Sequence, residues 1–250
     1  MTAGVPATVL LLVLLAGVQV DELPPARHVT IQQSDSTLGS VEGFVRLAGQ
    51  ETPSPTTVEN STDPEVCGRL HSLDDLVISH ESRAVRYVIA ALVDVPKDRV
   101  PAHVPSRLVL DNRDCRFEPH VAAVVVGDTV TTTNGDPILH TTHFYGALRG
   151  NISLSASGMI VSRVARSPGM VTTLCDVHGW MKAFIRVDEH PYHAVTDETG
   201  YFHISEIPPG SYTLELWHEK LGARKVAVRI EPGITSRIDI EYALSRNKPL

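Results

Sequence analysis

Short segments in which apolar and polar residues alternate dominate the C-terminal part of the chain. Tyr212, Leu214 and Leu216 share one face of an extended segment, and residues 226–230 and 238–242 alternate in the same way. Glycine and proline turns separate these segments about every ten residues. Alternation with a period of two, interrupted at this spacing, predicts an antiparallel β-sandwich.

The rest of the chain also favours strands over helices. Apolar and β-branched segments bounded by turns predict strands at 41–47, 86–95, 121–126, 129–133, 159–164, 170–174 and 181–187. Residues 48–65 are rich in proline, threonine and serine without periodicity, so they predict a long loop. Residues 66–80 leave room for a short helix. The chain as a whole is therefore expected to be all-β.

An apolar run at residues 7–20 is followed by a polar stretch at residues 21–38. The run is shorter than a membrane span and resembles the core of a signal peptide. We therefore expect residues 1–20 to be a cleaved signal or an uncleaved anchor, and residues 21–38 to be a linker. The expected location is extracytoplasmic, in the periplasm, secreted or at the cell surface. Contact with a membrane is expected only through this segment, if it stays uncleaved.

Composition narrows the class of protein further. The chain has 250 residues, of which 42% are hydrophobic, enough to bury a sizeable core. Lysine and arginine number 22 against 29 aspartates and glutamates, a net charge of −7. Nucleic acid is therefore not an expected partner, because phosphate contacts need a basic face. There are three cysteines, and an exported chain that pairs two of them leaves one for another role.

One short segment brings together a thiol, an imidazole and a thioether. Cys175, His178 and Met181 have the spacing C-x2-H-x2-M between two predicted strands. A thiolate with two imidazoles and a weak axial thioether suits copper in its electron-transfer form. The remaining ligand is expected from a neighbouring strand end, where His140 follows a polar turn at residues 134–136.

Residues 108–189 resemble the cupredoxins, and among them the amicyanin and plastocyanin type. The resemblance rests on the sequence VGDTV at 126–130, on the stretch from Asn134 to His140, and on the short ligand loop. It implies a Greek-key β-sandwich with one type 1 copper site. In that site His140, Cys175 and His178 would be the trigonal ligands, and Met181 the axial one.

This segment departs from the family pattern at three positions. Thr141 stands where the family usually has an asparagine that braces the ligand loop, and Val177 and Gly179 replace prolines. These changes would loosen the loop and shift the redox potential without removing a donor. The residues expected beside the ligands, supporting them without binding the metal, are His143, Thr141 and Asn134.

Cys67 and Cys115 remain once Cys175 is assigned to the metal. A disulfide between them is expected in an exported chain, and it would keep both thiols from competing for copper. Together with His71 and His120 they could instead build a Cys2His2 zinc site, and free thiols are a further alternative. The sequence also leaves open a second metal site among His190, His193, His203 and His218.

Residues 190–244 resemble the carboxypeptidase regulatory-like, or transthyretin-like, β-sandwich. The G-x-V-x-G-x-V strand that usually opens this family matches residues 39–45, far upstream. We hypothesise that the strands of residues 39–100, which also hold the long loop, complete this sandwich, with the cupredoxin-like unit of residues 101–189 inserted in it. Two domains in tandem are the simpler alternative. Contacts between residues 41–47 and 201–217 would distinguish the two arrangements.

The cupredoxin resemblance implies a carrier of single electrons between redox partner proteins, which would dock near an exposed edge of His178. No enzymatic activity is expected, because a mononuclear site with four protein ligands leaves no position for a substrate. Two alternatives are a copper-binding or delivery protein without electron transfer, and a structural cell-surface β-sandwich protein with a degenerate metal site. Ready exchange of copper would favour the first alternative, and absent copper binding the second.

Overall fold

The structure is a computed structural model that describes Met1, residues 37–49 and residues 53–244. Apart from Met1, the predicted signal or anchor lies outside these residues, as do residues 21–36 of the predicted linker. The described residues fold almost entirely into β-strands, which confirms the all-β prediction. Among them, no helix has the length and apolar character needed to cross a membrane.

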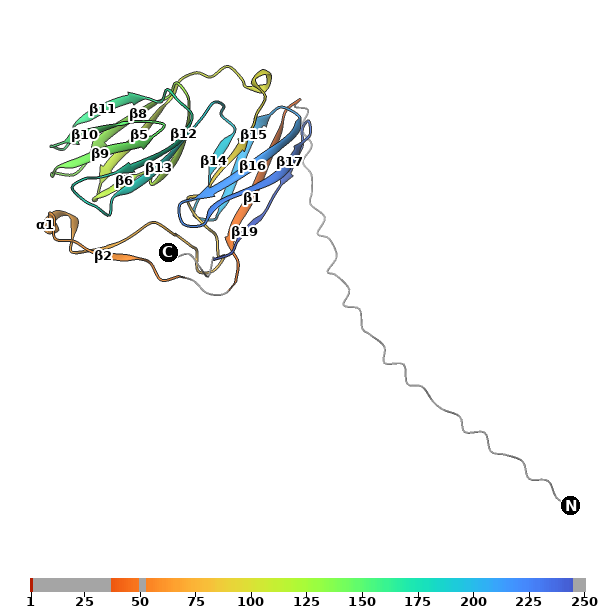
Figure 1. Ribbon diagram of the computed structural model, residues 1–250, viewed down its shortest axis with the longest axis horizontal. Coiled ribbons are helices and arrows are strands. Elements are labelled where there is room, and N and C mark those ends of the chain that lie inside the picture. Colours follow the sequence, from red (N-terminus) through yellow and green to blue (C-terminus); the bar gives the residue numbers. More distant parts are fainter. Residues whose placement is uncertain (2–36, 50–52, 245–250) are drawn as a thin grey trace. The chain divides into compact units, whose positions relative to one another are not determined.

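Nine strands between residues 107 and 188 form two sheets, which we call the inner sandwich (Figure 1). One sheet has the strand order β10-β9-β12-β13-β7 and the other has the order β11-β8-β5-β6. Alternation in the last strand of this set buries Ala183, Ile185 and Val187 in the core between the sheets. The strands are β5 (Arg107–Arg113), β6 (Arg116–Glu118), β7 (Val121–Val125), β8 (Thr129–Asn134), β9 (His140–Gly146), β10 (Gly150–Leu154), β11 (Ile160–Val164), β12 (Gly169–Leu174) and β13 (Lys182–Asp188).

Strands from both ends of the described chain build a second pair of sheets, the outer sandwich. Its strands are β1 (Gly39–Leu47), β4 (Ile89–Val93), β14 (His193–Val195), β15 (Tyr201–Ile207), β16 (Gly210–His218), β17 (Gly222–Ile230), β18 (Thr235–Arg237) and β19 (Ile240–Tyr242). β1 pairs with β15, with Phe44 opposite Tyr201, and β4 pairs with β16, with Leu92 opposite Leu214. In Figure 1 the orange β1 accordingly lies among blue strands. The inner sandwich thus lies, in sequence, between β4 and β14.

Gly43 in β1 has no room for a side chain. Val41 and Val45 point into the core of the outer sandwich and are fully buried. A Cβ atom on Gly43, between them, would lie 1.8 Å from the carbonyl oxygen of Ile238. This position therefore needs a residue without a side chain, because β1 and the chain before β19 approach each other too closely for any other.

Residues 57–74 leave the outer sandwich and run to the inner one, and we call them the strap. They contain β2 (Thr57–Glu59), the four-residue helix α1 (Pro64–Cys67) and β3 (Leu70–Ser72). The long loop expected at residues 48–65 therefore includes the strand β2, and the short helix for which residues 66–80 left room begins earlier, at Pro64, and ends at Cys67. The helix ends at Cys67 because Gly68, with φ of 82°, leaves the helical conformation. The other helix among the described residues is the 3-10 turn η1 (Lys97–Arg99).

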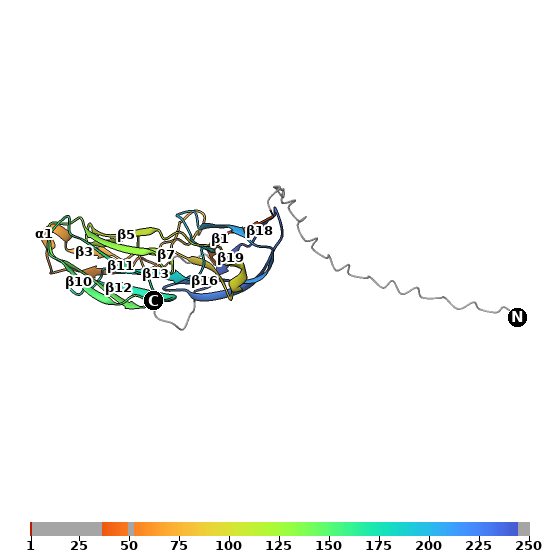
Figure 2. The ribbon, with the colours of Figure 1, turned by 90° about the horizontal axis from the view of Figure 1, so that it is seen from above.

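A disulfide holds the strap against the inner sandwich. Cys67 in α1 is bonded to Cys115, which lies in the turn between β5 and β6, so the disulfide expected from the sequence is present. His71 in β3 stacks on Trp180, with ring centroids 4.2 Å apart. Seen from above, α1 and β3 lie beside the strands of the inner sandwich (Figure 2).

Candidate metal centre

Three potential metal ligands converge at one end of the inner sandwich. His140 is the first residue of β9, Cys175 follows the last residue of β12, and His178 lies in the loop before β13. β9 and β12 are hydrogen-bonded neighbours, so their adjacent ends bring His140 and Cys175 together. His140 and His178 are fully buried, and Cys175 is 3% exposed.

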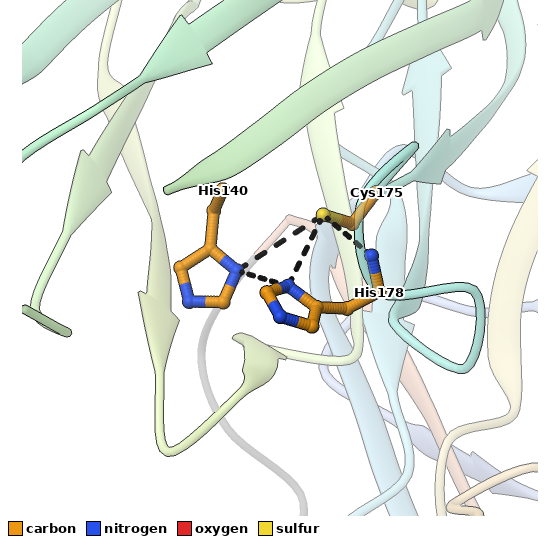
Figure 3. Close-up of side chains that lie close together, drawn as sticks. All are labelled: His140, Cys175 and His178. Carbon is orange, nitrogen blue, oxygen red and sulfur yellow. Dashed lines mark hydrogen bonds between the residues drawn. The ribbon is translucent and has the colours of Figure 1, made fainter. Parts of the chain in front are cut away.

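The two rings and the sulfur point toward one another (Figure 3). Sγ of Cys175 lies 4.0 Å from Nδ1 of His140 and 3.8 Å from Nδ1 of His178, and the two Nδ1 atoms are 3.1 Å apart. Donors bound to a metal at about 2.0–2.3 Å in a trigonal plane would be separated by roughly 3.5–3.8 Å. The observed separations are close to these values, so a metal ion fits between the three atoms with small adjustments.

The tautomer of each ring leaves Nδ1 free to bind a cation. Nε2 of His140 lies 2.9 Å from Oδ2 of Asp136, and Nε2 of His178 lies 3.2 Å from Oδ2 of Asp63. Because a carboxylate can only accept a hydrogen bond, each ring carries its proton on Nε2. Two nitrogen lone pairs therefore face each other at 3.1 Å beside a sulfur, an arrangement that a bound cation stabilises.

The sulfur of Cys175 is surrounded by hydrogen-bond donors. Burial alone would raise the pKa of its thiol, but the contact with the His140 ring and hydrogen bonds from backbone N–H groups outweigh this effect and lower the pKa to about 6. The N–H groups of Thr141 and His178 each donate to Sγ at 3.4 Å. The site therefore favours the thiolate, which is the form that binds metals.

Met181 completes the predicted ligand set from the end of the same loop. Its side chain is 2% exposed and belongs to the same core cluster as Cys175. Both backbone polar groups of Met181 are hydrogen-bonded within the loop. Its N–H donates to the carbonyl of His178 at 2.9 Å, and its carbonyl accepts the N–H of Cys175 at 3.2 Å. These two bonds close the loop that holds Cys175, His178 and Met181.

Two of the residues expected beside the ligands hold the segments that carry them. Thr141 contacts the ligand loop, and Asn134 contacts the turn before His140. Thr141 donates its N–H to Cys175, and its hydroxyl accepts the N–H of Asp176 at 2.7 Å, so it braces the loop in place of the usual asparagine. The side-chain amide of Asn134 donates to the carbonyls of Ile138 and Leu154 and fixes the turn before His140.

His143, the third of these residues, contacts the residue that follows Cys175. It lies three residues after His140 along β9, so the two side chains point to opposite faces of the sheet. Its Nδ1 atom lies 3.0 Å from the Asp176 carboxylate and 2.9 Å from the Tyr145 hydroxyl, and its side chain is partly exposed. Its described contact with the ligand loop is the one to Asp176, the residue after Cys175.

The expectation that His178 presents an exposed edge is wrong. The side chain of His178 is fully buried, because Asp63 of the strap reaches its Nε2 atom and Trp180 packs at a ring-centroid distance of 5.0 Å. Four residues after Asp63, the disulfide from Cys67 to Cys115 bonds the strap to the inner sandwich. The face at which a ligand histidine would otherwise meet solvent is therefore covered.

The alternative Cys2His2 zinc site is also wrong, because Cys67 and Cys115 are bonded to each other. His71 stacks on Trp180 and is buried. His120 lies elsewhere, with Nε2 on a carboxylate oxygen of Glu219 at 2.5 Å.

The remaining histidines form no second cluster in the part of the chain that the structure describes. Groups of three metal-type ligands occur there only around His140, and none includes a histidine of the C-terminal strands. His193 faces the Asp188 carboxylate at 2.9 Å, and Nδ1 of His218 accepts the N–H of Lys220 at 3.1 Å. His190 accepts the N–H of Tyr192, and His203 is exposed on β15.

Sequence reasoning missed the two carboxylates that orient the ligand rings. Asp136 lies four residues before His140 in the polar turn already singled out, so a carboxylate within reach of a ligand histidine was available as a signal. Asp63 precedes His178 by 115 residues, and no local pattern links the two positions.

Comparisons with known proteins match parts of this chain. The family model described as polysaccharide lyase family 4, domain II, matches residues 146–238, which is less than half of the chain. Among curated proteins, none matches this sequence. The resemblance of residues 190–244 to carboxypeptidase regulatory-like sandwiches stays a prediction.

Several solved structures are similar over about a third of the chain or slightly more. The copper-containing nitrite reductase NirK from Thermus scotoductus SA-01 is 22% identical, with a TM-score of 0.31, over 35% of this chain and 23% of that one. A reduced mutant of amicyanin is 22% identical, with a TM-score of 0.30, over 40% of this chain and 98% of that one. A purple cupredoxin from Nitrosopumilus maritimus is 21% identical, with a TM-score of 0.30, over 33% of this chain and 99% of that one. This chain thus spans about a quarter of the NirK chain.

Proposed function

We propose that this protein binds one copper ion in a type 1 site and carries single electrons between redox proteins outside the cytoplasm. The observation that carries the proposal is the buried set of Cys175, His140 and His178, in which two unprotonated Nδ1 atoms lie 3.1 Å apart beside a thiol of low pKa. Copper bound there supplies a one-electron couple between Cu(I) and Cu(II). Met181 is the proposed axial ligand.

The residues around the ligands support this role by keeping the site rigid. Asp136 and Asp63 each fix one imidazole, and Thr141 fixes the sulfur by its N–H. Little movement is then needed when the charge of the metal changes, and burial of the ligands keeps water away from the sulfur. With Met181 as the fourth ligand, no position at the metal would be left for a substrate, so we propose a carrier rather than an enzyme.

The closed site also favours electron transfer over copper delivery. A delivery protein must release its ion readily to a partner, and here the strap lies over His178 and is fixed by a disulfide. The disulfide itself supports an extracytoplasmic location, because such bonds persist in oxidising compartments. A redox partner would approach over the strap, where Val66 and Leu70 are exposed apolar residues.

A redox titration of the copper-loaded protein tests the proposal. We expect one electron per copper to be taken up and returned reversibly, with copper retained in both states against a chelator added in slight excess. Transfer of the ion to the chelator on reduction would contradict electron carriage and favour delivery. Absence of a reversible one-electron step would contradict it as well.

A further inference from the structure

His140 belongs to two sets of potential metal ligands. Besides the set with Cys175 and His178, the ligand atoms of Cys115, Asp136 and His140 all lie within 4.8 Å of one another. All three residues are buried, and Cys115 and His140 are inaccessible to solvent. A thiolate, a carboxylate and an imidazole are suitable ligands for a divalent ion such as Zn²⁺.

In the structure the sulfur of Cys115 is occupied by its bond to Cys67. The two cysteines are held very differently. Cys115 lies in the tight turn between β5 and β6, with Arg113 opposite Arg116, and its N–H donates to Oδ2 of Asp136 at 2.9 Å. Its position therefore has supports other than the disulfide, whereas Cys67 lies on the strap, in a four-residue helix with no buried residue.

We propose that reduction of the Cys67–Cys115 disulfide creates a second metal site, formed by Cys115, Asp136 and His140, that takes a thiophilic divalent ion such as Zn²⁺. Cys67 is partly exposed and Cys115 is buried, so a thiolate attacks the sulfur of Cys67 and Cys115 leaves as the thiolate. With a dithiol as reductant, its second thiol then displaces Cys67. The dithiol ends as a disulfide, and two electrons and two protons have passed to the cysteines.

The two sites share one imidazole. The proton that His140 carries on Nε2 points at Asp136, and this tautomer gives Nδ1 to the set with Cys175. A metal ion bound by Asp136, Cys115 and Nε2 of this ring would displace that proton to Nδ1, the atom that faces Cys175. The second site is therefore expected to weaken the first, and this competition rests on the proposed copper function, whereas the second site itself does not.

The test removes Cys175, so that only the second site contributes a thiolate, and uses Co²⁺ as the spectroscopic probe. Two full-length variants are compared, Cys67→Ser/Cys175→Ser and Cys115→Ser/Cys175→Ser. Both lack the disulfide and both keep one thiol, but only the first keeps the thiol beside Asp136 and His140. We expect the first to bind one Co²⁺ with a thiolate-to-cobalt charge-transfer band, and the second to lack the band and bind roughly ten-fold or more weakly. Equal binding by the two variants, or no band in either, would overturn the proposal.

A second arm keeps both native cysteines of the disulfide. The Cys175→Ser chain is titrated with Co²⁺ before and after reduction by a phosphine, with the fold followed by circular dichroism. Binding with a thiolate band only after reduction supports the proposal, and unfolding on reduction contradicts it, because the site then does not form. Neither arm depends on copper binding, so a failure here leaves the proposed function standing. A colourless copper titration of the native chain leaves this proposal standing.

Discussion

The Nε2 atom of His178 lies 3.2 Å from a carboxylate oxygen of Asp63, a residue 115 positions earlier in the chain. Asp63 immediately precedes helix α1 and has a left-handed backbone, with φ of 49°. Through this contact the strap covers a candidate ligand histidine and places its Nε2 proton toward Asp63, so that Nδ1 faces Cys175. The strap is thus part of the candidate metal centre.

Removing the Asp63 carboxylate is expected to loosen this cover. Asparagine also tolerates the left-handed conformation, so Asp63→Asn changes the charge while keeping the backbone. The side chain of Asp63 is 41% exposed, so its contact is worth only about 0.5–1 kcal/mol. We expect a strong chelator to remove copper from Asp63→Asn about two- to five-fold faster than from the native protein.

Glu65 provides the matched control for this variant. It lies in helix α1, two residues after Asp63, is exposed, and is also acidic. Glu65→Gln is expected to leave the rate of copper removal unchanged. If the two variants release copper at the same rate, the contact between Asp63 and His178 does not protect the site.

Asp136 is expected to matter for both stability and metal affinity. Its carboxylate accepts the N–H groups of Asp114 and Cys115 and orients His140. Asp136→Ala leaves the buried N–H of Cys115 and the partly buried N–H of Asp114 without this partner, at a cost of about 1–3 kcal/mol in the free energy of unfolding. It also frees the ring, which is expected to weaken copper binding by roughly 10–100-fold.

Asp136→Asn separates the two effects, because it keeps an oxygen acceptor but loses the charge. Urea unfolding of the copper-free protein measures stability, and competition with a chelator of known affinity measures copper binding. We expect Asp136→Asn to unfold closer to the native protein than Asp136→Ala, with both variants binding copper more weakly. Native copper affinity in both would show that Asp136 does not position His140.

His218 is expected to make the fold less stable in mild acid. It is 1% exposed in the outer sandwich, and burial lowers its pKa from 6.5 to about 4. In the unfolded chain it takes up a proton near pH 6.5, whereas in the folded chain it does so only near pH 4. Its contribution to stability is therefore complete above pH 6.5 and is lost as the pH falls toward 4, by about 3 kcal/mol in all.

The variant His218→Asn isolates this contribution, because an asparagine oxygen can replace Nδ1 as acceptor for the N–H of Lys220. Urea unfolding of the copper-free protein between pH 7 and pH 4 is expected to show a shallower loss of stability in His218→Asn than in the native protein. His80→Asn, at an exposed turn, serves as the control. Parallel stability curves for native protein and His218→Asn would contradict the expectation.

Sequence reasoning succeeded where the relevant residues are close in the chain. The alternation in β13 and β16 follows directly from one buried face, which is why these strands could be predicted. Cys175 and His178 are three residues apart in one loop, so their proximity needed no knowledge of the fold. His140 was expected from its place after a polar turn at a strand end and from the family resemblance, but its contact with Cys175 depends on the pairing of β9 with β12.

The features that could not be predicted arise from contacts between distant segments. A strap that crosses to the inner sandwich carries no apolar period of its own, and α1 buries no residue. Its position is set by the bond from Cys67 to Cys115 and by the stacking of His71 on Trp180. The burial of His178 follows from these contacts, which the family resemblance, with its expected exposed edge of His178, did not include.

A titration of the native protein with Cu²⁺, followed by its visible absorption spectrum, tests the central claim most directly. We expect an intense blue thiolate-to-copper band that saturates at one equivalent and is absent from Cys175→Ser, with circular dichroism showing that both proteins are folded. A folded native protein that takes up Cu²⁺ without this band, or takes up none, would contradict the assignment of Cys175, His140 and His178 to a type 1 copper site.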